Sequence, residues 1–176
     1  MGTQPTDDPE TVGAAVVTIS SERSLEEDPA GDAIADVFEA AGHDVVTREL
    51  IARNYDNVQS KVSRLVDRSD VDLVVTTGGT GVEPEDATLE AVQPLIDKEL
   101  PAFLDLFHEL SYMEIGTRMV SSRAFAGIAD GVPVFCLPNN ADATTLACEA
   151  IIAPEATRLA VLSNGPAEEE EEKRQA

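Results

Sequence analysis

The residues best suited to chemistry form a glycine-rich loop, TTGGTG, at residues 76–81. Glycines allow positive φ and let the backbone come close to a ligand, so that several backbone N–H groups can point at one anion. The threonines beside them add hydroxyl donors. We therefore expect this loop to bind a phosphate group or a similar anion, through Thr77, Gly78, Gly79, Thr80 and Gly81.

Two well-known phosphate-binding loops do not match this segment. The nucleoside triphosphatase loop, GxxxxGK[ST], uses a lysine to reach the terminal phosphates, and no lysine lies between Lys61 and Lys98. The dinucleotide fingerprint, GxGxxG, is also missing from the segment. The loop must therefore belong to another kind of anion site.

The loop and the residues after it resemble the molybdopterin-binding family, which includes MoaB, MogA and a domain of gephyrin. The resemblance rests first on TTGGTG followed by Asp86, Thr88 and Glu90. Three further segments resemble the family in the same order along the chain. They are AAVVTISSERSLEEDPAGDAI, SYMEIGTRMVSSRAFAGIADG and VPVFCLPNNADATTLACEAIIAPE.

The resemblance implies an activity and a site. It implies molybdenum or tungsten cofactor biosynthesis, in which the protein binds molybdopterin and adenylylates it with MgATP as a molybdopterin adenylyltransferase. Asp86 would be catalytic and would hold Mg²⁺. Substrate contacts would come from the glycine loop and from Ser20, Glu90, Ser122, Arg123, Pro138, Asn139 and Asn140. Relatives form trimers, sometimes paired into hexamers, so we expect self-association.

Simpler roles remain open for several of these residues. Asp86 is also suited to capping the helix that follows it. Arg123 is about equally suited to a surface ion pair. Ser20 ends a strand, where its hydroxyl can cap a turn instead of meeting a ligand.

The sequence also departs from the family pattern at three places. Relatives commonly carry an aspartate after the second strand, where this chain has Arg53 and Asn54, with Asp56 nearby. They carry an arginine at the position of Glu85, and a glycine in the loop where this chain has Asn139. These differences motivate an alternative, a non-catalytic molybdopterin-binding or assembly protein.

The charge of the chain excludes one class of partner. Its 176 residues include 34 acids and 12 bases, for a formal net charge of −22. Five consecutive glutamates at 168–172 account for only part of this excess. A nucleic-acid partner needs a basic surface, so we expect none. An acid-rich, lysine-poor surface predicts a halophile's protein that stays hydrated in molar salt, with a merely acidic mesophilic protein as the alternative.

The remaining sequence signals concern the cellular compartment and the roles of the cysteines and histidines. The N-terminus lacks the apolar stretch of a signal peptide, and no segment has membrane-spanning length, so we expect a cytoplasmic protein. Cys136 and Cys148 do not form a CxxC pair, which predicts two buried, reduced thiols. His43 and His108 each lack a second ligand at helical spacing, so we expect no metal role for them.

The elements that must position the glycine loop alternate between strands and helices. Apolar runs predict strands at 14–19, around Val45 and Val46, at 71–77 and at 132–137. Helical spacing predicts helices between them, including one from about Asp86, one led by Pro101, and a last pair broken at Pro154.

This alternation predicts a three-layer α/β/α fold with a mainly parallel, doubly wound sheet. We place the domain at residues 13–163, between a flexible arm, 1–12, and an acidic disordered tail, 164–176. Parallel strands deliver their carboxyl ends to one edge of a sheet. The turns after Ile19, Thr77 and Leu137 should therefore meet in one ligand-binding crevice.

Overall fold

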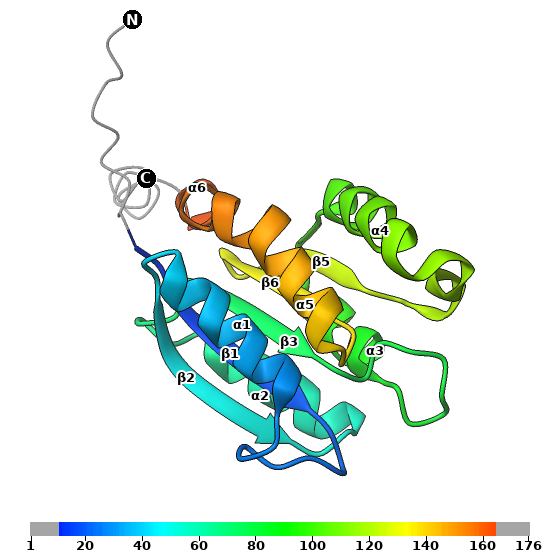
Figure 1. Cartoon of the computed structure of the whole chain (residues 1–176). Helices are drawn as coiled ribbons and strands as arrows, with labels where there is room; N and C mark the ends of the chain where they lie inside the picture. The colour runs from blue at the N-terminus through cyan, green and yellow to red at the C-terminus, as the bar shows by residue number, and fades with distance from the viewer. Residues whose placement is uncertain (1–10, 165–176) are drawn as a thin grey trace, which may run out of the picture.

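The computed structural model describes residues 11–164 and confirms the predicted three-layer α/β/α fold (Figure 1). Six strands form one sheet in the order β2-β1-β3-β6-β5-β4. Their bounds are β1 Gly13–Ile19, β2 Asp44–Ile51, β3 Leu73–Thr77, β4 Lys98–Glu99, β5 Phe125–Ala129 and β6 Val132–Leu137. Strands β2, β1, β3 and β6 are parallel to one another, whereas β5 runs antiparallel to β6 and β4.

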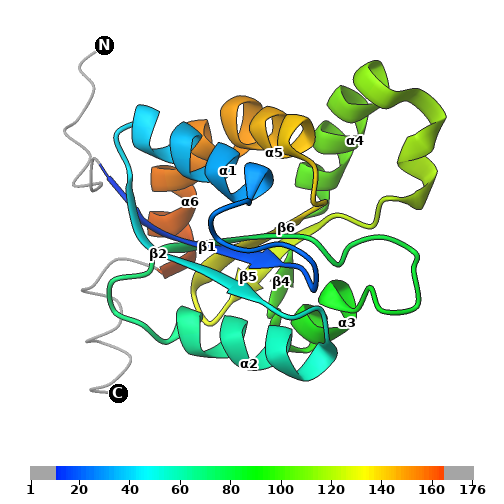
Figure 2. The same cartoon turned by 60° about the horizontal axis from the view of Figure 1, so that its bottom comes forward.

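Helices cover both faces of this sheet (Figure 2). Their bounds are α1 Pro29–Ala40, α2 Tyr55–Val66, α3 Thr88–Val92, α4 Pro101–Ile115, α5 Ala141–Ala147 and α6 Ala153–Asn164. Two short 3₁₀ segments, η1 Gln93–Leu95 and η2 Gly116–Ser121, follow α3 and α4, and a π-helical turn, η3 Cys148–Ile152, joins α5 to α6. Helices α1, α4 and α5 lie on one face, and α2 and α3 lie on the other.

The absence of polar alternation in β1 and β3 has a direct structural cause, because both faces of the sheet are buried. In β1, Ala14 and Val16 pack toward α1 and α4, whereas Ala15, Val17 and Ile19 pack toward α2. Each large apolar side chain fully buried in this way stabilises the fold by about 1.5–3 kcal/mol. The two cores therefore hold β1 and β3 rigidly, and the loops at their ends start from fixed positions.

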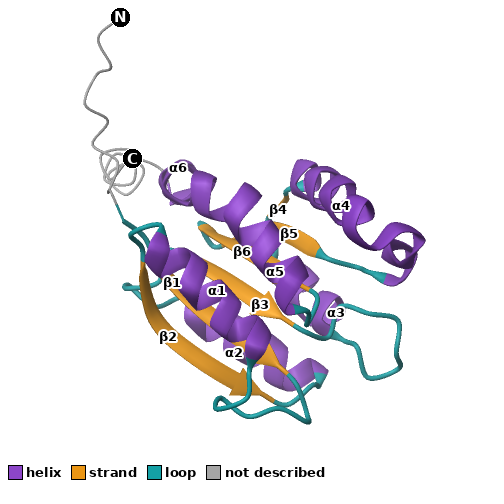
Figure 3. Ribbon diagram, viewed as in Figure 1, coloured by secondary structure: helices purple, strands orange, loops and turns teal. Residues whose placement is uncertain are grey.

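The chain changes direction across the sheet between β1 and β3. It runs from β1 outward to β2, returns through α2, and continues on the other side of β1 as β3. Ligands of doubly wound proteins bind at such a switch point, outside the carboxyl ends of the strands. Figure 3 shows the long loop from β3 to α3 projecting beyond this edge.

Two features of the fold differ from the prediction. The antiparallel strands β4 and β5 were not predicted, and β5 joins β6 through a two-residue turn in which Asp130 and Gly131 have φ of 49° and 80°. This Asp-Gly pair is typical of a type I′ hairpin. The helical path does not break at Pro154. A π-helical turn lies just before this proline, and its wider backbone lets the chain continue into α6.

The predicted arm and tail lie mostly outside the described residues, at 1–10 and 165–176. Val12, which we placed in the arm, is instead 1% exposed, and its backbone N–H donates to His43 Nδ1. Asn164, which we placed in the tail, is the last residue of α6. Within residues 11–164, no helix is both long and apolar enough to cross a membrane.

Candidate functional site

A cavity of about 1190 Å³ lies at the carboxyl ends of β1, β3 and β6. Its wall includes residues 19–23 after β1, residues 78–81 after β3 and residues 138–140 after β6. The three turns therefore meet in one crevice, as the sequence predicted. Among the predicted site residues, those that line it are Ser20, Gly78, Gly79, Thr80, Gly81, Asp86, Ser122, Pro138, Asn139 and Asn140.

The glycine loop passes so close to its neighbours that side chains have no room. Gly78 and Gly79 both have positive φ, 109° and 70°. A Cβ atom on Gly78 would collide with the backbone oxygen of Ile19, and one on Gly79 would collide with the Thr88 hydroxyl. Glycine is therefore required at both positions, by conformation and by contact.

Hydrogen bonds from neighbouring elements fix the carbonyl groups of this loop. The Thr88 side chain and backbone N–H donate to the oxygens of Gly78 and Gly79, at 2.9 and 3.1 Å. Gly78 N donates to the Leu137 oxygen on β6. The amides of Gly79, Thr80 and Gly81, however, donate no hydrogen bond to the described residues. These three residues line the cavity, so their backbone N–H groups are the candidates to bind an anion there.

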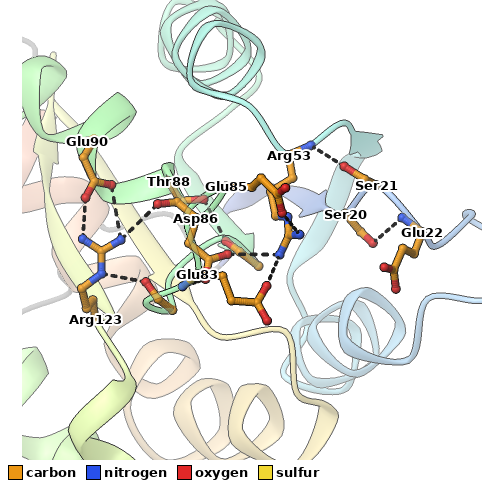
Figure 4. Close-up of polar contacts among 12 residues, drawn as sticks. Ser20, Ser21, Glu22, Arg53, Glu83, Glu85, Asp86, Thr88, Glu90 and Arg123 are labelled. Carbon is orange, nitrogen blue, oxygen red and sulfur yellow. Dashed lines mark hydrogen bonds and ion pairs between the residues drawn. The ribbon is translucent and has the colours of Figure 1, made fainter.

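Asp86 folds back against this loop and does not cap a helix. Helix α3 begins at Thr88, and the residue at its N-cap is Ala87. One Asp86 oxygen accepts from Glu83 N at 3.0 Å, and the other accepts from Arg53 Nη1 at 3.3 Å (Figure 4). The carboxylate is 7% exposed. The capping interpretation is therefore wrong for α3, since Asp86 organises the turn that precedes it.

Arg53 is a cavity residue that the sequence did not assign to the site. Its guanidinium donates to Glu83 at 2.9 Å and to Glu85 at 2.8 Å, in addition to Asp86. These hydrogen bonds connect the β2–α2 turn to residues 83–86, which follow the glycine loop, as Figure 4 shows. The only sign in the sequence that Arg53 belongs to the site was the departure from the family pattern at Arg53 and Glu85. Asp56, considered there as a substitute carboxylate, lies in the first turn of α2 and does not line the cavity.

Arg123 holds the glycine loop from outside the cavity. Its guanidinium donates to the backbone oxygens of Gly81 and Asp86, at 2.8 and 3.2 Å, and pairs with Glu90. Hydrogen bonding from Arg123 lowers the pKa of the Glu90 carboxyl below its ordinary value. Neither residue lines the cavity. The structure thus places both behind the loop, which agrees with the ion-pair interpretation of Arg123.

Thr77 is also turned away from the cavity. Its hydroxyl donates to the Pro138 oxygen at 2.9 Å and so joins the glycine loop to the turn after β6. Next to Pro138, Asn140 caps α5, because its side-chain oxygen accepts from Ala143 N at 2.9 Å. Ser20 accepts from the backbone N–H groups two and three residues on, which is the turn-capping role considered for it.

The charges around the cavity are mixed, with acids in excess. Sequence reasoning missed most of them, because residues far apart in the chain supply them. The arginines are Arg23, Arg53 and Arg118. The acids are Glu22, Glu27, Glu83, Asp86, Glu114, Asp142 and Glu149. Among residues 11–164, no three histidine, cysteine or acidic side chains are grouped as metal ligands.

The two cysteines play no part in this site. Both are buried and reduced, as predicted. Burial raises the pKa of Cys136 and of Cys148 to about 12, so neither is a thiolate near neutral pH. Since the thiolate is the nucleophile and the metal ligand, these thiols serve as apolar core side chains.

A doubly wound sheet with a glycine loop at its switch point defines an α/β protein whose crevice is suited to an anionic ligand. Comparison with known proteins gives the family. A family model described as "Probable molybdopterin binding domain" matches residues 15–158, and the chain belongs to this family.

Relatives and solved structures agree with this family. The chain is 38% identical over 148 residues to molybdenum cofactor biosynthesis protein B of Halalkalibacterium halodurans, covering 84% of this chain and 87% of the relative. It is 38% identical over 141 residues to the Escherichia coli protein of the same name, with 80% and 83% covered. The crystal structure of the tungsten cofactor synthesizing protein MoaB from Pyrococcus furiosus matches with a TM-score of 0.78 and 34% identity, covering 89% and 99%.

Proposed function

We propose that the protein acts in molybdenum or tungsten cofactor biosynthesis by binding molybdopterin, with the terminal phosphate of that ligand on the glycine loop. The observation that carries this proposal is the set of backbone donors at Gly79, Thr80 and Gly81 beside the cavity. The family description and the names of the relatives supply the ligand and the pathway. Backbone N–H groups suit a phosphate because they are fixed donors that need no reorganisation.

We further propose that bound molybdopterin is adenylylated by MgATP. An oxygen of the molybdopterin phosphate attacks the α-phosphorus of ATP, the bond from that phosphorus to the β-phosphate oxygen breaks, and pyrophosphate leaves. Such a transfer depends on positioning and on stabilising charge more than on covalent help. The cavity, at about 1190 Å³, exceeds the roughly 300–1,000 Å³ of ordinary ligand pockets, and Arg23, Arg53 and Arg118 border it.

The described residues do not form a Mg²⁺ site from protein ligands alone. Both oxygens of Asp86, the predicted metal ligand, already accept hydrogen bonds from Arg53 and from the backbone of Glu83. No cluster of three potential ligands occurs in the described part of the chain. In this proposal Mg²⁺ is therefore part of the MgATP substrate, and Asp86 shapes the loop and holds Arg53.

The same contacts favour a second candidate, a protein that binds molybdopterin without adenylylating it. Arg53 neutralises Asp86 and is itself held by Glu83 and Glu85, so the charged groups nearest the glycine loop are already paired with one another. Such a site retains its backbone donors for a phosphate. In such a site the carboxylates that follow the glycine loop are all paired with Arg53, so none of them is free to take part in adenylyl transfer.

One experiment separates the two candidates. Purified protein is incubated in high salt with molybdopterin and MgATP, and adenylated molybdopterin and pyrophosphate are both measured. Formation of both products in equal amounts supports the enzyme. Stoichiometric binding of molybdopterin with no pyrophosphate supports the binding protein. If molybdopterin does not bind, both candidates are wrong.

We also propose that the chain associates with itself. Large apolar side chains are exposed on α4 and η2, namely Leu106, Tyr112, Met113, Ile115 and Val120. Five large exposed apolar side chains on two consecutive elements favour a protein–protein interface there. Sedimentation should show an oligomer, and Val120→Asp should shift it toward the monomer.

A further inference from the structure

The carbonyl groups of the glycine loop are bonded to two residues behind it. Thr88 Oγ1 donates to the Gly78 oxygen at 2.9 Å, and the Thr88 backbone N–H donates to the Gly79 oxygen at 3.1 Å. The Arg123 backbone N–H donates to the Thr80 oxygen at 2.9 Å. The directions of three successive carbonyl groups are therefore fixed by Thr88, at the start of α3, and by Arg123, just before β5.

The geometry of the peptide bond extends this control to the N–H groups of the loop. No peptide bond among the described residues is cis. In a planar trans peptide, the carbonyl of one residue and the N–H of the next residue point in opposite directions. The carbonyls of residues 78–80 point toward Thr88 and Arg123. The N–H groups of residues 79–81 therefore point away from both.

Thr88 and Arg123 lie outside the cavity wall to which the loop belongs. Gly79, Thr80 and Gly81 line the cavity, whereas Thr88 and Arg123 do not. Thr88 is also fully buried, at 0% exposed. A ligand in the cavity can therefore reach the three loop residues without contacting the two residues behind them. Any effect of Thr88 or Arg123 on binding must act through the loop.

The Arg123 side chain also holds the segment that leaves the loop. Its Nε donates to the Gly81 oxygen at 2.8 Å, and its Nη2 donates to the Asp86 oxygen at 3.2 Å. One planar guanidinium thus fixes both ends of residues 81–86. Lysine carries a compact charge on a flexible stem and does not reproduce this fork.

We propose that Thr88 and Arg123 are positioning residues, which aim the N–H groups of residues 79–81 into the cavity and so set the affinity of the loop for phosphate. The inference rests on the proposed function, because it takes the loop as the phosphate site. Donors that are already aimed need no reordering when the ligand binds, so fixing them raises affinity. Neither residue contacts the ligand.

Two substitutions at Thr88 test this proposal. Thr88→Val removes the hydroxyl that holds the Gly78 oxygen and keeps a side chain of similar size. We expect it to weaken molybdopterin binding about threefold to tenfold, the loss of one hydrogen bond. Thr88→Ser keeps the hydroxyl and should stay within about twofold of the wild type. Calorimetry at fixed salt measures the affinities, and a melting curve shows that each variant is folded.

Arg123→Lys is a second, independent variant, and Thr144→Val is the matched control. Arg123→Lys keeps the positive charge but loses the fork, so its affinity should fall at least about threefold. Thr144 is a buried threonine on α5 outside the cavity, and its hydroxyl donates to the Ala141 oxygen at 3.0 Å. Thr144→Val makes the same chemical change as Thr88→Val and should bind like the wild type.

Inorganic phosphate provides a readout that a merely structural role would not change. In ¹⁵N-labelled protein, phosphate should shift the amide signals of Gly79, Thr80 and Gly81. We expect the half-saturating phosphate concentration to rise in Thr88→Val and to return toward the wild-type value in Thr88→Ser. Folded Thr88→Val and Arg123→Lys with the wild-type phosphate response overturn the inference, and so does Thr88→Ser that responds as weakly as Thr88→Val.

The two ligands together separate this inference from the proposed function. If phosphate shifts the three amides in a Thr88-dependent way but molybdopterin does not bind, the proposed function is wrong and the inference stands. If molybdopterin binds equally well to the wild type and to both folded variants, Thr88→Val and Arg123→Lys, the inference is wrong and the proposed function stands. If phosphate shifts none of these amides and molybdopterin does not bind, both are wrong.

Discussion

Arg53 connects two positions that looked unrelated in the sequence. The family resemblance implies an acid near position 53 and a base at position 85, and this chain reverses both charges. In the structure Arg53 and Glu85 are bonded to each other at 2.8 Å. The two positions that differ from the family pattern thus form one ion pair. The resemblance implies an acid at the first position and a base at the second, whereas this chain has the base first and the acid second. The pair connects the β2–α2 turn to the segment that follows the glycine loop.

We predict that Arg53→Gln weakens binding of molybdopterin about tenfold, or about 1.4 kcal/mol. Glu83, Glu85 and Asp86 would then face the phosphate without the guanidinium that now neutralises them. The dissociation constant should be measured by calorimetry at fixed salt. Arg158→Gln is the control, because Arg158 pairs with Glu155 on α6 outside the cavity. Wild-type affinity in Arg53→Gln would show that Arg53 does not act on the ligand.

At the scale of elements, the Arg123–Glu90 pair ties α3 to the segment before β5. Because Arg123 lowers the pKa of Glu90 in the folded state, the pair stabilises the fold above the ordinary glutamate pKa. That contribution is lost as the pH falls through the lowered pKa. Glu90 is about half exposed, so solvent screening limits the contribution.

We predict that Glu90→Gln lowers the free energy of unfolding by about 0.5 kcal/mol at neutral pH, as for other exposed ion pairs. The difference from the wild type should close as the pH falls below the ordinary glutamate range. Urea unfolding at a series of pH values measures it. Glu109→Gln, at an exposed position without an ion pair in the described residues, should show no such closing gap. A gap that persists at the lowest pH contradicts the ion-pair account.

The elements that the sequence predicted are those specified by local patterns. Unbroken apolar runs gave β1, β3 and β6, since a strand buried on both faces has no polar alternation. Strand β4 has only two residues, both exposed, and so carries no such pattern. The continuous path through Pro154 depends on a π-helical turn, which the spacing of apolar residues does not reveal.

The sequence predicted part of the site, as it predicted part of the fold. Gly78 and Gly79 predicted the loop from the sequence, because few other residues adopt its backbone conformation. The roles of Arg53 and Arg123 depend on contacts with residues 30 or more positions away in the chain. The family resemblance assigned Arg123 to the ligand, with a surface ion pair as the alternative. The sequence did not decide between them, because packing and not local pattern sets the direction of a long side chain.

At the scale of the whole molecule, the net charge of −22 should make stability depend on salt. At millimolar ionic strength like charges repel one another over tens of ångströms, whereas molar salt reduces this range to about 3 Å. We predict that the melting temperature falls on dilution from molar to millimolar KCl, by roughly 2–4 °C for each kcal/mol lost. Deleting residues 165–176 should leave most of this dependence. A melting temperature that stays flat or rises removes the halophile interpretation.

The central claim is that the glycine loop binds the molybdopterin phosphate, and Gly79→Ala tests it most directly. A Cβ at this position meets Thr88 and strains a φ of 70°, which displaces the amide donors. Gly42→Ala is the control, because Gly42 has a φ of 87° but open space around it and lies outside the cavity.

Molybdopterin binding by calorimetry, with a melting curve for each variant, is the measurement. We predict that Gly42→Ala binds like the wild type and that folded Gly79→Ala binds at least about tenfold more weakly, a loss of about 1.4 kcal/mol. Equal affinity in folded Gly79→Ala and wild type would contradict the claim.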